Sequence, residues 1–562
     1  MVAKETLTLS AATGDPNRQV QIGNGSSFGS GSAAGDMSLT AHTLAISGST
    51  YVTGQSADVA LLNDGGDGGS VGTAANPLNV VVDSLAVHTD GADANIVSLS
   101  QGRSIGVGAN GIDLGTGDLK LSANGAVTQT AAILAHSVNI ATTTGAIALT
   151  NAANAFSIAT LATSGADNAS LADAIDLTIT GANIGGNLAL SGAGAIGQTG
   201  AIHSGALSVS TTGGAINLTN AANSFGAATL ATSGADNASL YNANALTIAN
   251  ATIGGTLTLS SGATIGQTGA IHATALNATT TNGAITLTNA ANTIATATLA
   301  TAGADNASLT DASALTIASA NIGGTLTLTG ANGIGQTGAI HASALNVTTS
   351  SGAIALTNAA NTIGTATIAT SGAENASLAD ASALTIAGAN VGGTLTLTGA
   401  NGIGQTGAIH AGALNVTTSN GAITLTNAAN TFNTATLATA GSDNASLTDA
   451  SALTIAGANI GGNLTLLGSG AIGQTGAIHA NALNVTSTGG AITLTNAGNT
   501  LNTATLSTSG SNNASLTDAS ALTVASATVG GKLTLTGANG IGQRGALHAP
   551  DLTAPPHGGA QT

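Results

Sequence analysis

A 69-residue unit recurs along most of the chain, and this repeat constrains the fold more than any other feature of the sequence. The heptapeptide Gly-Gln-Thr-Gly-Ala-Ile-His begins at residues 197, 266, 335, 404 and 473, and a variant, Gly-Gln-Arg-Gly-Ala-Leu-His, begins at residue 542. Residues 335–403 and 404–472 are identical at 53 of 69 positions. A period of this length indicates that each copy is one structural unit that stacks on its neighbours.

The repeat divides the chain into three parts. Residues 1–127 form a less regular N-terminal region, residues 128–541 contain six copies, and residues 542–562 form a truncated repeat with a proline-containing tail. The copies are 128–196, 197–265, 266–334, 335–403, 404–472 and 473–541. A function carried by the copies would therefore be distributed among them and not confined to one site.

Within a copy, aliphatic residues alternate with Thr, Asn or Ser, and Gly, Asn or Ser interrupt the alternation. The alternating segments are 344–349, 352–358, 365–370, 375–380, 383–387 and 393–398. This period of two predicts short β-strands that each have one apolar face, and no segment has a helical period. Asn358 and Asn361 are expected at turns with left-handed backbone.

The composition favours a long, thin architecture over compact domains. Apolar residues make up 43% of the chain, but it has only four Phe, two Tyr and no Trp. Coils of about 20–23 residues, about three per copy, would bury these small aliphatic side chains in a continuous narrow core. We therefore predict an all-β, single-stranded parallel β-helix (solenoid) of about 25 coils, an elongated rod about 120 Å long. Small β-sandwiches would need larger core residues.

Charge and targeting signals exclude several classes of function. Six basic and 23 acidic residues give a net charge of −17, so the sequence predicts no binding to nucleic acid or to an anionic membrane surface. The absence of Cys excludes disulfides and suits an exported bacterial protein. The first ten residues read as a strand and not as a signal peptide, and no apolar stretch predicts insertion into a membrane as a helix.

Several segments resemble a known family of bacterial exoproteins. They are Gly-Thr-Ala-Ala-Asn-Pro-Leu at 72–78 and the recurrent strands Ala-Leu-Thr-Ile, Gly-Thr-Leu-Thr-Leu and Gly-Ala-Ile-Thr-Leu-Thr-Asn. Together they resemble the repeat regions of filamentous-haemagglutinin-like proteins, the two-partner-secreted β-helical adhesins that include β-strand-repeat proteins.

This resemblance implies a secreted or cell-surface, outer-membrane-associated location and an outer-membrane secretion partner. That family carries a signal peptide and a secretion domain, which the N-terminal residues here do not match. We therefore expect the chain to be part of a larger exoprotein. The sequence does not identify the glycan or protein receptor.

Two acidic columns recur from copy to copy. The first contains Asp167, Asp236, Asp305, Glu374 and Asp443, followed by Asn512; the second, six residues later, contains Asp173, Asn242, Asp311, Asp380, Asp449 and Asp518. Carboxylates suit Ca²⁺, so the candidate ligand pairs are Asp167 with Asp173, Asp305 with Asp311, and Asp443 with Asp449. The Ca²⁺-binding nonapeptide is absent and Asn interrupts both columns, which favours solvated turn residues and no cofactor.

For two further columns, a functional site is weighed against an ordinary surface position. The His column contains His203, His272, His341, His410, His479 and His548. Three coils, about 14 Å, would separate its members, so neighbouring His residues could not share a metal ion. The acceptor pattern Asn-Ala-Ser begins at Asn168 and recurs at 237, 306, 375, 444 and 513. Strand-edge Asn is favoured there over glycosylation.

These observations lead to one main hypothesis and two alternatives. The main one is a non-catalytic stalk or fibre region of a bacterial adhesin that makes weak multivalent contacts. One alternative is an ice- or surface-binding solenoid that uses Thr pairs, such as Thr365/Thr367, Thr394/Thr396 and Thr434/Thr436. The other is a β-helical polysaccharide-active protein, for which the repeats show no single carboxylate cluster.

Overall fold

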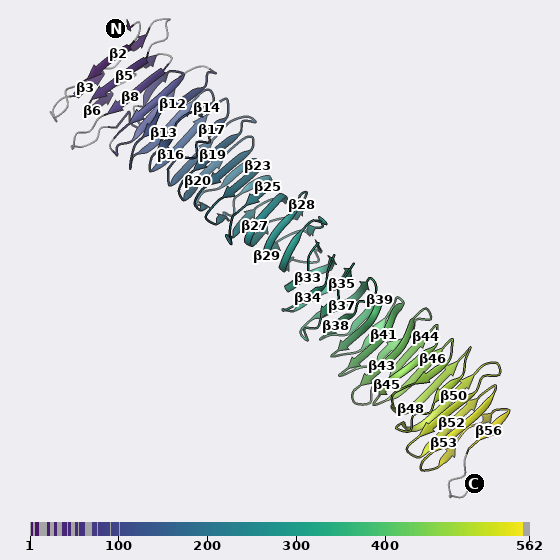
Figure 1. Cartoon of the computed structure of the whole chain (residues 1–562). Helices are drawn as coiled ribbons and strands as arrows, with labels where there is room; N and C mark the ends of the chain where they lie inside the picture. The colour runs from purple at the N-terminus through teal and green to yellow at the C-terminus, as the bar shows by residue number, and fades with distance from the viewer. Residues whose placement is uncertain are drawn as a thin grey trace. The chain divides into compact units, whose positions relative to one another are not determined.

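The computed structural model describes residues 70–75, 77–89, 91–99 and 102–554, and the backbone of eight strands before residue 62. Every regular element in these residues is a β-strand, and no helix that could span a membrane occurs among them. The chain is an all-β parallel β-solenoid of about 24 coils, as predicted. It divides into an N-terminal unit, residues 1–281, and a C-terminal unit, residues 282–562, and each is described by itself (Figure 1).

The N-terminal unit contains strands β1 to β29. Their bounds are β1 (Val2–Ala3), β2 (Thr6–Ser10), β3 (Gln19–Ile22), β4 (Ser27–Ser30), β5 (Asp36–Ala41), β6 (Thr43–Ile46), β7 (Tyr51–Thr53), β8 (Ser56–Leu61), β9 (Leu78–Val81), β10 (Ser84–His88), β11 (Ala94–Ser98), β12 (Ile105–Asp113), β13 (Asp118–Ala123), β14 (Val127–Gln129), β15 (Ile133–Leu134), β16 (Ser137–Thr142), β17 (Ile147–Leu149), β18 (Ile158–Ala162), β19 (Ala169–Asp173), β20 (Leu177–Asn183), β21 (Leu188–Gly192), β22 (Ile196–Gln198), β23 (Ile202–Thr211), β24 (Ile216–Leu218), β25 (Ser224–Ala231), β26 (Ala238–Asn242), β27 (Leu246–Ser261), β28 (Ile265–Gln267) and β29 (Ile271–Thr280).

The C-terminal unit contains strands β30 to β56. Their bounds are β30 (Ile285–Leu287), β31 (Thr293–Ala300), β32 (Ala307–Asp311), β33 (Leu315–Gly330), β34 (Ile334–Gln336), β35 (Ile340–Thr349), β36 (Ile354–Leu356), β37 (Thr362–Thr370), β38 (Ala376–Asp380), β39 (Leu384–Gly399), β40 (Ile403–Gln405), β41 (Ile409–Thr418), β42 (Ile423–Leu425), β43 (Thr431–Thr439), β44 (Ala445–Asp449), β45 (Leu453–Asn459), β46 (Asn463–Gly468), β47 (Ile472–Gln474), β48 (Ile478–Ser487), β49 (Ile492–Leu494), β50 (Thr500–Thr508), β51 (Ala514–Asp518), β52 (Leu522–Thr528), β53 (Lys532–Gly537), β54 (Ile541–Gln543), β55 (Leu547–His548) and β56 (Asp551–Thr553).

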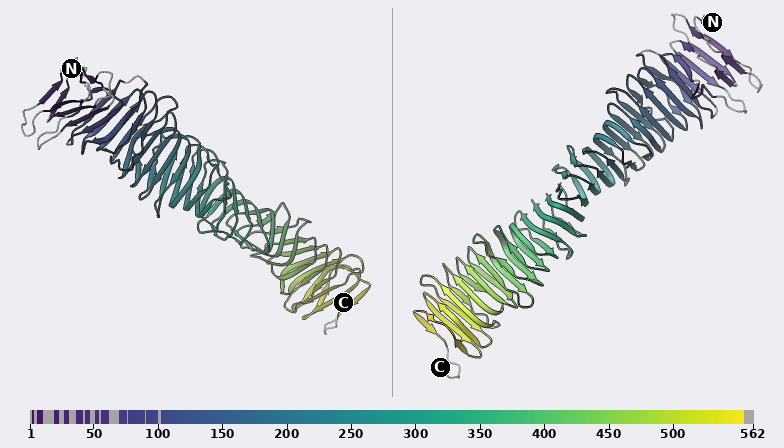
Figure 2. Two further views of the ribbon diagram at one scale, coloured as in Figure 1. Left: turned by 45° about the horizontal axis from the view of Figure 1, so that its top comes forward. Right: turned by 180° about the vertical axis from the view of Figure 1, so that it is seen from behind.

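Strands of the C-terminal unit form two parallel ladders, which we call wall 1 and wall 2, and the chain alternates between them (Figure 2). Wall 1 runs through β36, β38, the second half of β39, β41, β43, β45, β47 and β49. Wall 2 runs through β35, β37, the first half of β39, β40, β42, β44, β46, β48, β50, β52 and β54.

Seven steps along wall 1 lead from β36 to β49, which is the equivalent strand two copies later. Each copy therefore forms three and a half coils, and a coil takes about 20 residues, a length found in other solenoid repeats. The prediction of about three coils per copy was wrong. Its cause is the three-residue strand β40, whose single aliphatic residue, Ile403, gives no alternating signal.

An odd number of half-coils per copy places equivalent residues of successive copies on different walls. Strand β36 belongs to wall 1, and β42, its equivalent one copy later, belongs to wall 2. The N-terminal unit has the same alternation, with one ladder through β20, β22, β24 and β26 and the other through β21, β23 and β25. Each wall thus presents a given repeat position only in every second copy.

The core is a narrow stack of small aliphatic side chains. Leu395, Leu397 and Leu414 are fully buried on wall 1, and Thr396, between the first two, is partly exposed. This alternation matches the period of two in the sequence. Stacked coils thus bury apolar faces that no coil could bury alone.

One Gly-Gly pair recurs once in each copy, and its two flanking strands merge where Thr follows the pair but stay separate where Asn or Lys follows it. The sequence predicts separate strands at 383–387 and 393–398, but β39 continues from Leu384 to Gly399, through Thr394. In the next copy Asn463 occupies this position, and the chain forms two strands, β45 and β46, with a break at 460–462. The β-branched Thr favours a strand, whereas Asn favours a turn.

Glycines carry the sharp turns between the walls. Gly372 has φ +61°, and a Cβ added at Gly392 would lie 1.6 Å from the carbonyl oxygen of Gly372 on the neighbouring coil. Every described residue with positive φ is Gly, so the expectation of left-handed backbone at Asn358 and Asn361 was wrong. Asn358 instead forms a local turn, in which its side-chain oxygen accepts a hydrogen bond from the backbone N–H of Ala360 at 2.9 Å.

Gly392→Ala should lower the apparent melting temperature of the protein, because the methyl group forces two coils apart at a cost of about 1–3 kcal/mol. Gly404→Ala is the matched control. A Cβ at Gly404 meets no atom within 4 Å, and its φ is not positive. The control should melt at or slightly above the wild-type temperature, because Ala reduces the entropy of the unfolded chain. Melting is measured by circular dichroism. Equal melting temperatures for the two variants would contradict the close contact between Gly392 and Gly372.

Candidate functional site

The two acidic columns lie at opposite ends of a short strand. Asp167 precedes β19 and Asp173 ends it, so at least about 13 Å of extended chain separates them. The carboxylate of Asp167 accepts a hydrogen bond from the backbone N–H of Gly145 at 2.6 Å, and that of Asp173 accepts one from Phe156 at 3.0 Å. The structure therefore does not bring these candidate Ca²⁺ ligands together. The equivalent strands β32 and β44 separate Asp305 from Asp311 and Asp443 from Asp449.

The second acidic column is buried and is hydrogen-bonded to the protein itself. Asp449 is fully buried, and its Oδ2 accepts the backbone N–H of Phe432, one coil earlier, at 2.9 Å. Its Oδ1 accepts the backbone N–H and the hydroxyl of Ser451 at 2.5 and 2.6 Å. Equivalent bonds occur at Asp311, Asp380 and Asp518. These carboxylates join neighbouring coils and are not the solvated turn residues that the sequence suggested.

Asp173 differs from the other buried carboxylates because no Ser stands two residues after it. Ile175 stands where Ser451 stands in the later copy, so Asp173 accepts only two backbone N–H groups, from Phe156 and Ile175. Burial raises the pKa of the Asp173 carboxyl from an ordinary 3.8 to about 6, against the opposing effect of those two hydrogen bonds. The equivalent residue one copy later is Asn242, whose neutral amide avoids this cost of burying a charge.

A buried Gln–Asn pair joins coils in nearly the same way, and sequence analysis missed it. Asn361 is fully buried; its Oδ1 accepts hydrogen bonds from Ile340 N–H and Gln336 Nε2, both at 2.8 Å. Its Nδ2 donates to Gln336 Oε1 at 2.9 Å and to the carbonyl of Ala379, on the next coil, at 3.0 Å. The signal was present as Gln and Asn recurring at a fixed separation: Gln129/Asn154, Gln198/Asn223, Gln405/Asn430 and Gln474/Asn499.

The His column lies on exposed strand ends. His341 and His479, at the starts of β35 and β48, are on wall 2, whereas His410, at the start of β41, is on wall 1. Seven coils, about 34 Å, separate the two on wall 2. Each His Nδ1 lies 2.6 or 2.7 Å from a Thr hydroxyl of the next coil: Thr362, Thr431 and Thr500. These side chains cannot form a metal ladder.

The Asn of each Asn-Ala-Ser sequence hydrogen-bonds to the following coil. The Oδ1 atoms of Asn168 and Asn375 accept the backbone N–H groups of Asn187 and Thr394, both at 2.7 Å. This position at the start of a strand is the strand-edge role that the sequence favoured. Within the described part of the chain, no group of three or more His, Cys, Asp and Glu side chains is arranged to hold a metal ion.

The Thr pairs do not form a continuous array. On wall 1, Thr396 has Asn415 as its neighbour on the next coil, and Asn415 has Thr436 as its neighbour on the coil after that. Thr394 is likewise followed by Ala413 and then by Thr434. Ala and Asn therefore separate these two Thr pairs on wall 1.

The fold and its recurring columns define a tandem-repeat β-solenoid. A family described as repeats of unknown function (DUF5649) matches residues 94–163, 166–232, 235–301, 304–370, 373–439, 442–508 and 511–556. These segments cover most of the chain, which therefore belongs to this family. No curated protein and no solved structure matches the chain.

Asp173→Asn should stabilise the protein near neutral pH. Because the folded-state pKa of Asp173 is raised, its contribution to stability is fully present below about pH 3.8 and is lost as pH rises through about 6. The melting temperature of the variant should therefore exceed that of the wild type at about pH 7.5, and the difference should shrink toward about pH 4.

Ile175→Ser is the companion variant, because it supplies the hydroxyl that Ser451 gives to Asp449. Ile175 is 41% exposed, so the loss of its side chain costs little core packing. At neutral pH, the melting temperature of Ile175→Ser should therefore lie between those of the wild type and Asp173→Asn. A difference between wild type and Asp173→Asn that does not change with pH would contradict the raised pKa.

Proposed function

We propose that the chain is a non-catalytic structural region of a secreted or cell-surface bacterial adhesin of the filamentous-haemagglutinin-like class. It would hold a binding region away from the cell and add weak contacts of its own, which repetition multiplies. Export would use an outer-membrane secretion partner, as the sequence resemblance implies. The receptor would be a glycan or a protein on a host or other surface.

The observation that carries this proposal is that the recurring polar side chains hydrogen-bond neighbouring coils of the fold itself. Asn361 and Asp449 are buried and join neighbouring coils. The Asn375 side chain accepts a hydrogen bond from a backbone N–H of the following coil. Catalytic groups need a concave site where a substrate reaches them. Columns that recur in every copy and bond to their own backbone instead suit a mechanical role.

The connectivity also suits export of an unfolded chain. Each strand pairs with strands one coil before and after it along the sequence, as in the steps from Leu395 to Leu414 and from Leu414 to Ala435. A coil can therefore form as soon as its own residues emerge and the preceding coil is in place. Folding of this kind outside the cell would draw the chain across the membrane without ATP.

Deletion of one copy, residues 266–334, should leave a folded protein whose adhesion is weakened but not abolished. Gly335 then follows Ile265, as Gly266 does in the intact chain, so the repeat continues without a break. The deletion removes three and a half coils, or about 17 Å of solenoid. Adhesion of bacteria displaying the intact and shortened chains can be compared in a surface-retention assay under flow.

Deletion of two copies, residues 197–334, supplies the graded comparison and should weaken adhesion further. Labelling of intact cells with a membrane-impermeant maleimide, through a Thr398→Cys substitution, reports display separately, because the chain has no other Cys. Failure of the maleimide to label intact cells would overturn the proposed location. Complete loss of adhesion in the single deletion, with display preserved, would contradict a distributed stalk role.

A further inference from the structure

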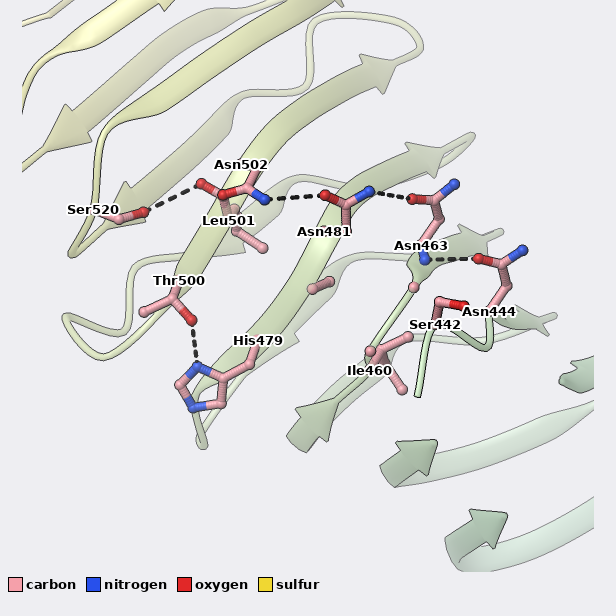
Figure 3. A pocket seen from close by; sticks show the side chains of 13 residues that line it. Ser442, Asn444, Ile460, Asn463, His479, Asn481, Thr500, Leu501, Asn502 and Ser520 are labelled. Atoms are coloured by element: carbon pink, nitrogen blue, oxygen red, sulfur yellow. Dashed lines mark hydrogen bonds between the residues drawn. The ribbon is translucent and has the colours of Figure 1, made fainter. Parts of the chain in front are cut away.

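An open groove of about 620 Å³ crosses neighbouring coils of the C-terminal unit (Figure 3). It lies along the turn before β44, the break between β45 and β46, and the first residues of β48 and β50. Four Asn side chains line it, one from each of these coils: Asn444, Asn463, Asn481 and Asn502. The groove therefore runs parallel to the solenoid axis, past successive coils.

The four Asn residues form a hydrogen-bonded ladder. Asn444 Oδ1 accepts the backbone N–H of Asn463 at 2.8 Å. Asn481 Nδ2 donates to Asn463 Oδ1 at 3.3 Å, and Asn502 Nδ2 donates to Asn481 Oδ1 at 3.0 Å, as Figure 3 shows. An amide side chain has two N–H donors and two acceptor lone pairs, so each exposed rung keeps donor or acceptor capacity for a ligand.

This ladder belongs to one place in the chain, although the fold repeats. The position of Asn481 is Gly205, Thr274, Ser343 and Gly412 in the preceding copies. The position of Asn502 is Asn433 one copy earlier and Gly364 before that. Asn463 also begins β46 after the break at 460–462, whereas the strand runs on through Thr394 one copy earlier. Gly461 and Gly462 therefore lie in a turn that lines the groove. Divergence from the repeat has therefore concentrated amides here.

The chemistry of the lining restricts the ligand class. None of the lining residues is Asp, Glu, Lys or Arg, so the groove offers no ion pair to a phosphate, sulfate or ammonium group. Its side-chain donors and acceptors are the Asn amides, the hydroxyls of Ser442, Thr500 and Ser520, and the imidazole of His479. Such a lining suits a neutral ligand with many hydroxyl groups, each able both to donate and to accept.

We propose that this groove binds a neutral oligosaccharide that lies along the Asn ladder. The rungs follow the coil spacing of about 4.8 Å, which is close to the length of one pyranose unit in an extended chain. One sugar unit would therefore face each rung. This proposal deepens the proposed adhesive role and rests on it for biological meaning, but binding by the purified chain does not depend on cellular location.

The test is saturation-transfer-difference NMR and isothermal titration calorimetry on the full chain. The neutral probes are the hexasaccharides of cellulose, xylan, mannan and chitin, and the anionic comparison is hexagalacturonate. At least one neutral probe should bind, and hexagalacturonate should bind more weakly. The double variant Asn481→Gly/Asn502→Gly should weaken binding of that neutral probe about tenfold or more, because it removes two amides that hydrogen-bond the ligand.

The matched control is Asn433→Gly, which changes the position equivalent to Asn502 in the preceding copy, outside the groove. It should bind like the wild type. Both variants introduce residues found at the same repeat position in other copies, Gly412 and Gly364, and circular dichroism should report an intact fold.

Failure of every neutral probe to bind, equal binding of hexagalacturonate, or wild-type affinity in the double variant would overturn the groove assignment. Binding by a chain that is absent from the cell surface would overturn only the proposed function. Surface display without saccharide binding would overturn only the assignment of the groove as a binding site.

Discussion

Each coil of this protein is held by the coil before it and the coil after it, through parallel backbone hydrogen bonds between their strands. The other features follow from this constraint. The interior is only as wide as the two walls allow, so Leu, Ile and Ala fill it and large aromatics are rare. Polar side chains that enter it, such as Asn361 and Asp449, complete their hydrogen bonds with neighbouring coils.

Three and a half coils per copy changes how the repeat is presented. If a copy took a whole number of coils, every copy would present the same face in the same direction. An odd number of half-coils instead places equivalent side chains on alternate walls, as with His341, His410 and His479. A site formed by one repeat position would thus occur on two sides of a unit, with about 34 Å between sites on one side. The Asn groove instead arises where one copy departs from its neighbours.

The sequence was sufficient to predict the strands and the solenoid, because alternation and the 69-residue period are local signals. It was insufficient for the number of coils in each copy, since Ile403 is the only aliphatic residue of its strand and carries no period. It also misplaced the second acidic column and Asn361, because burial of a polar residue depends on partners one coil away. Asn361 looks like a turn residue until its contacts with Gln336 and Ala379 are seen. The groove was missed for the same reason: its four Asn residues come from different coils.

The central claim, three and a half short coils in each copy, can be tested by disulfide trapping, because the chain contains no Cys. Thr396 and Asn415 are neighbours on adjacent coils of wall 1. Adjacent strands are about 4.8 Å apart, within the range that a disulfide spans. Thr396→Cys/Asn415→Cys should therefore form an intramolecular disulfide on mild oxidation, seen as a mass loss of two hydrogens. A repeat of three longer coils would instead pair residue 396 with one about 23 residues later. Oxidation of Thr396→Cys/Ser419→Cys while the first pair stays reduced would contradict the account.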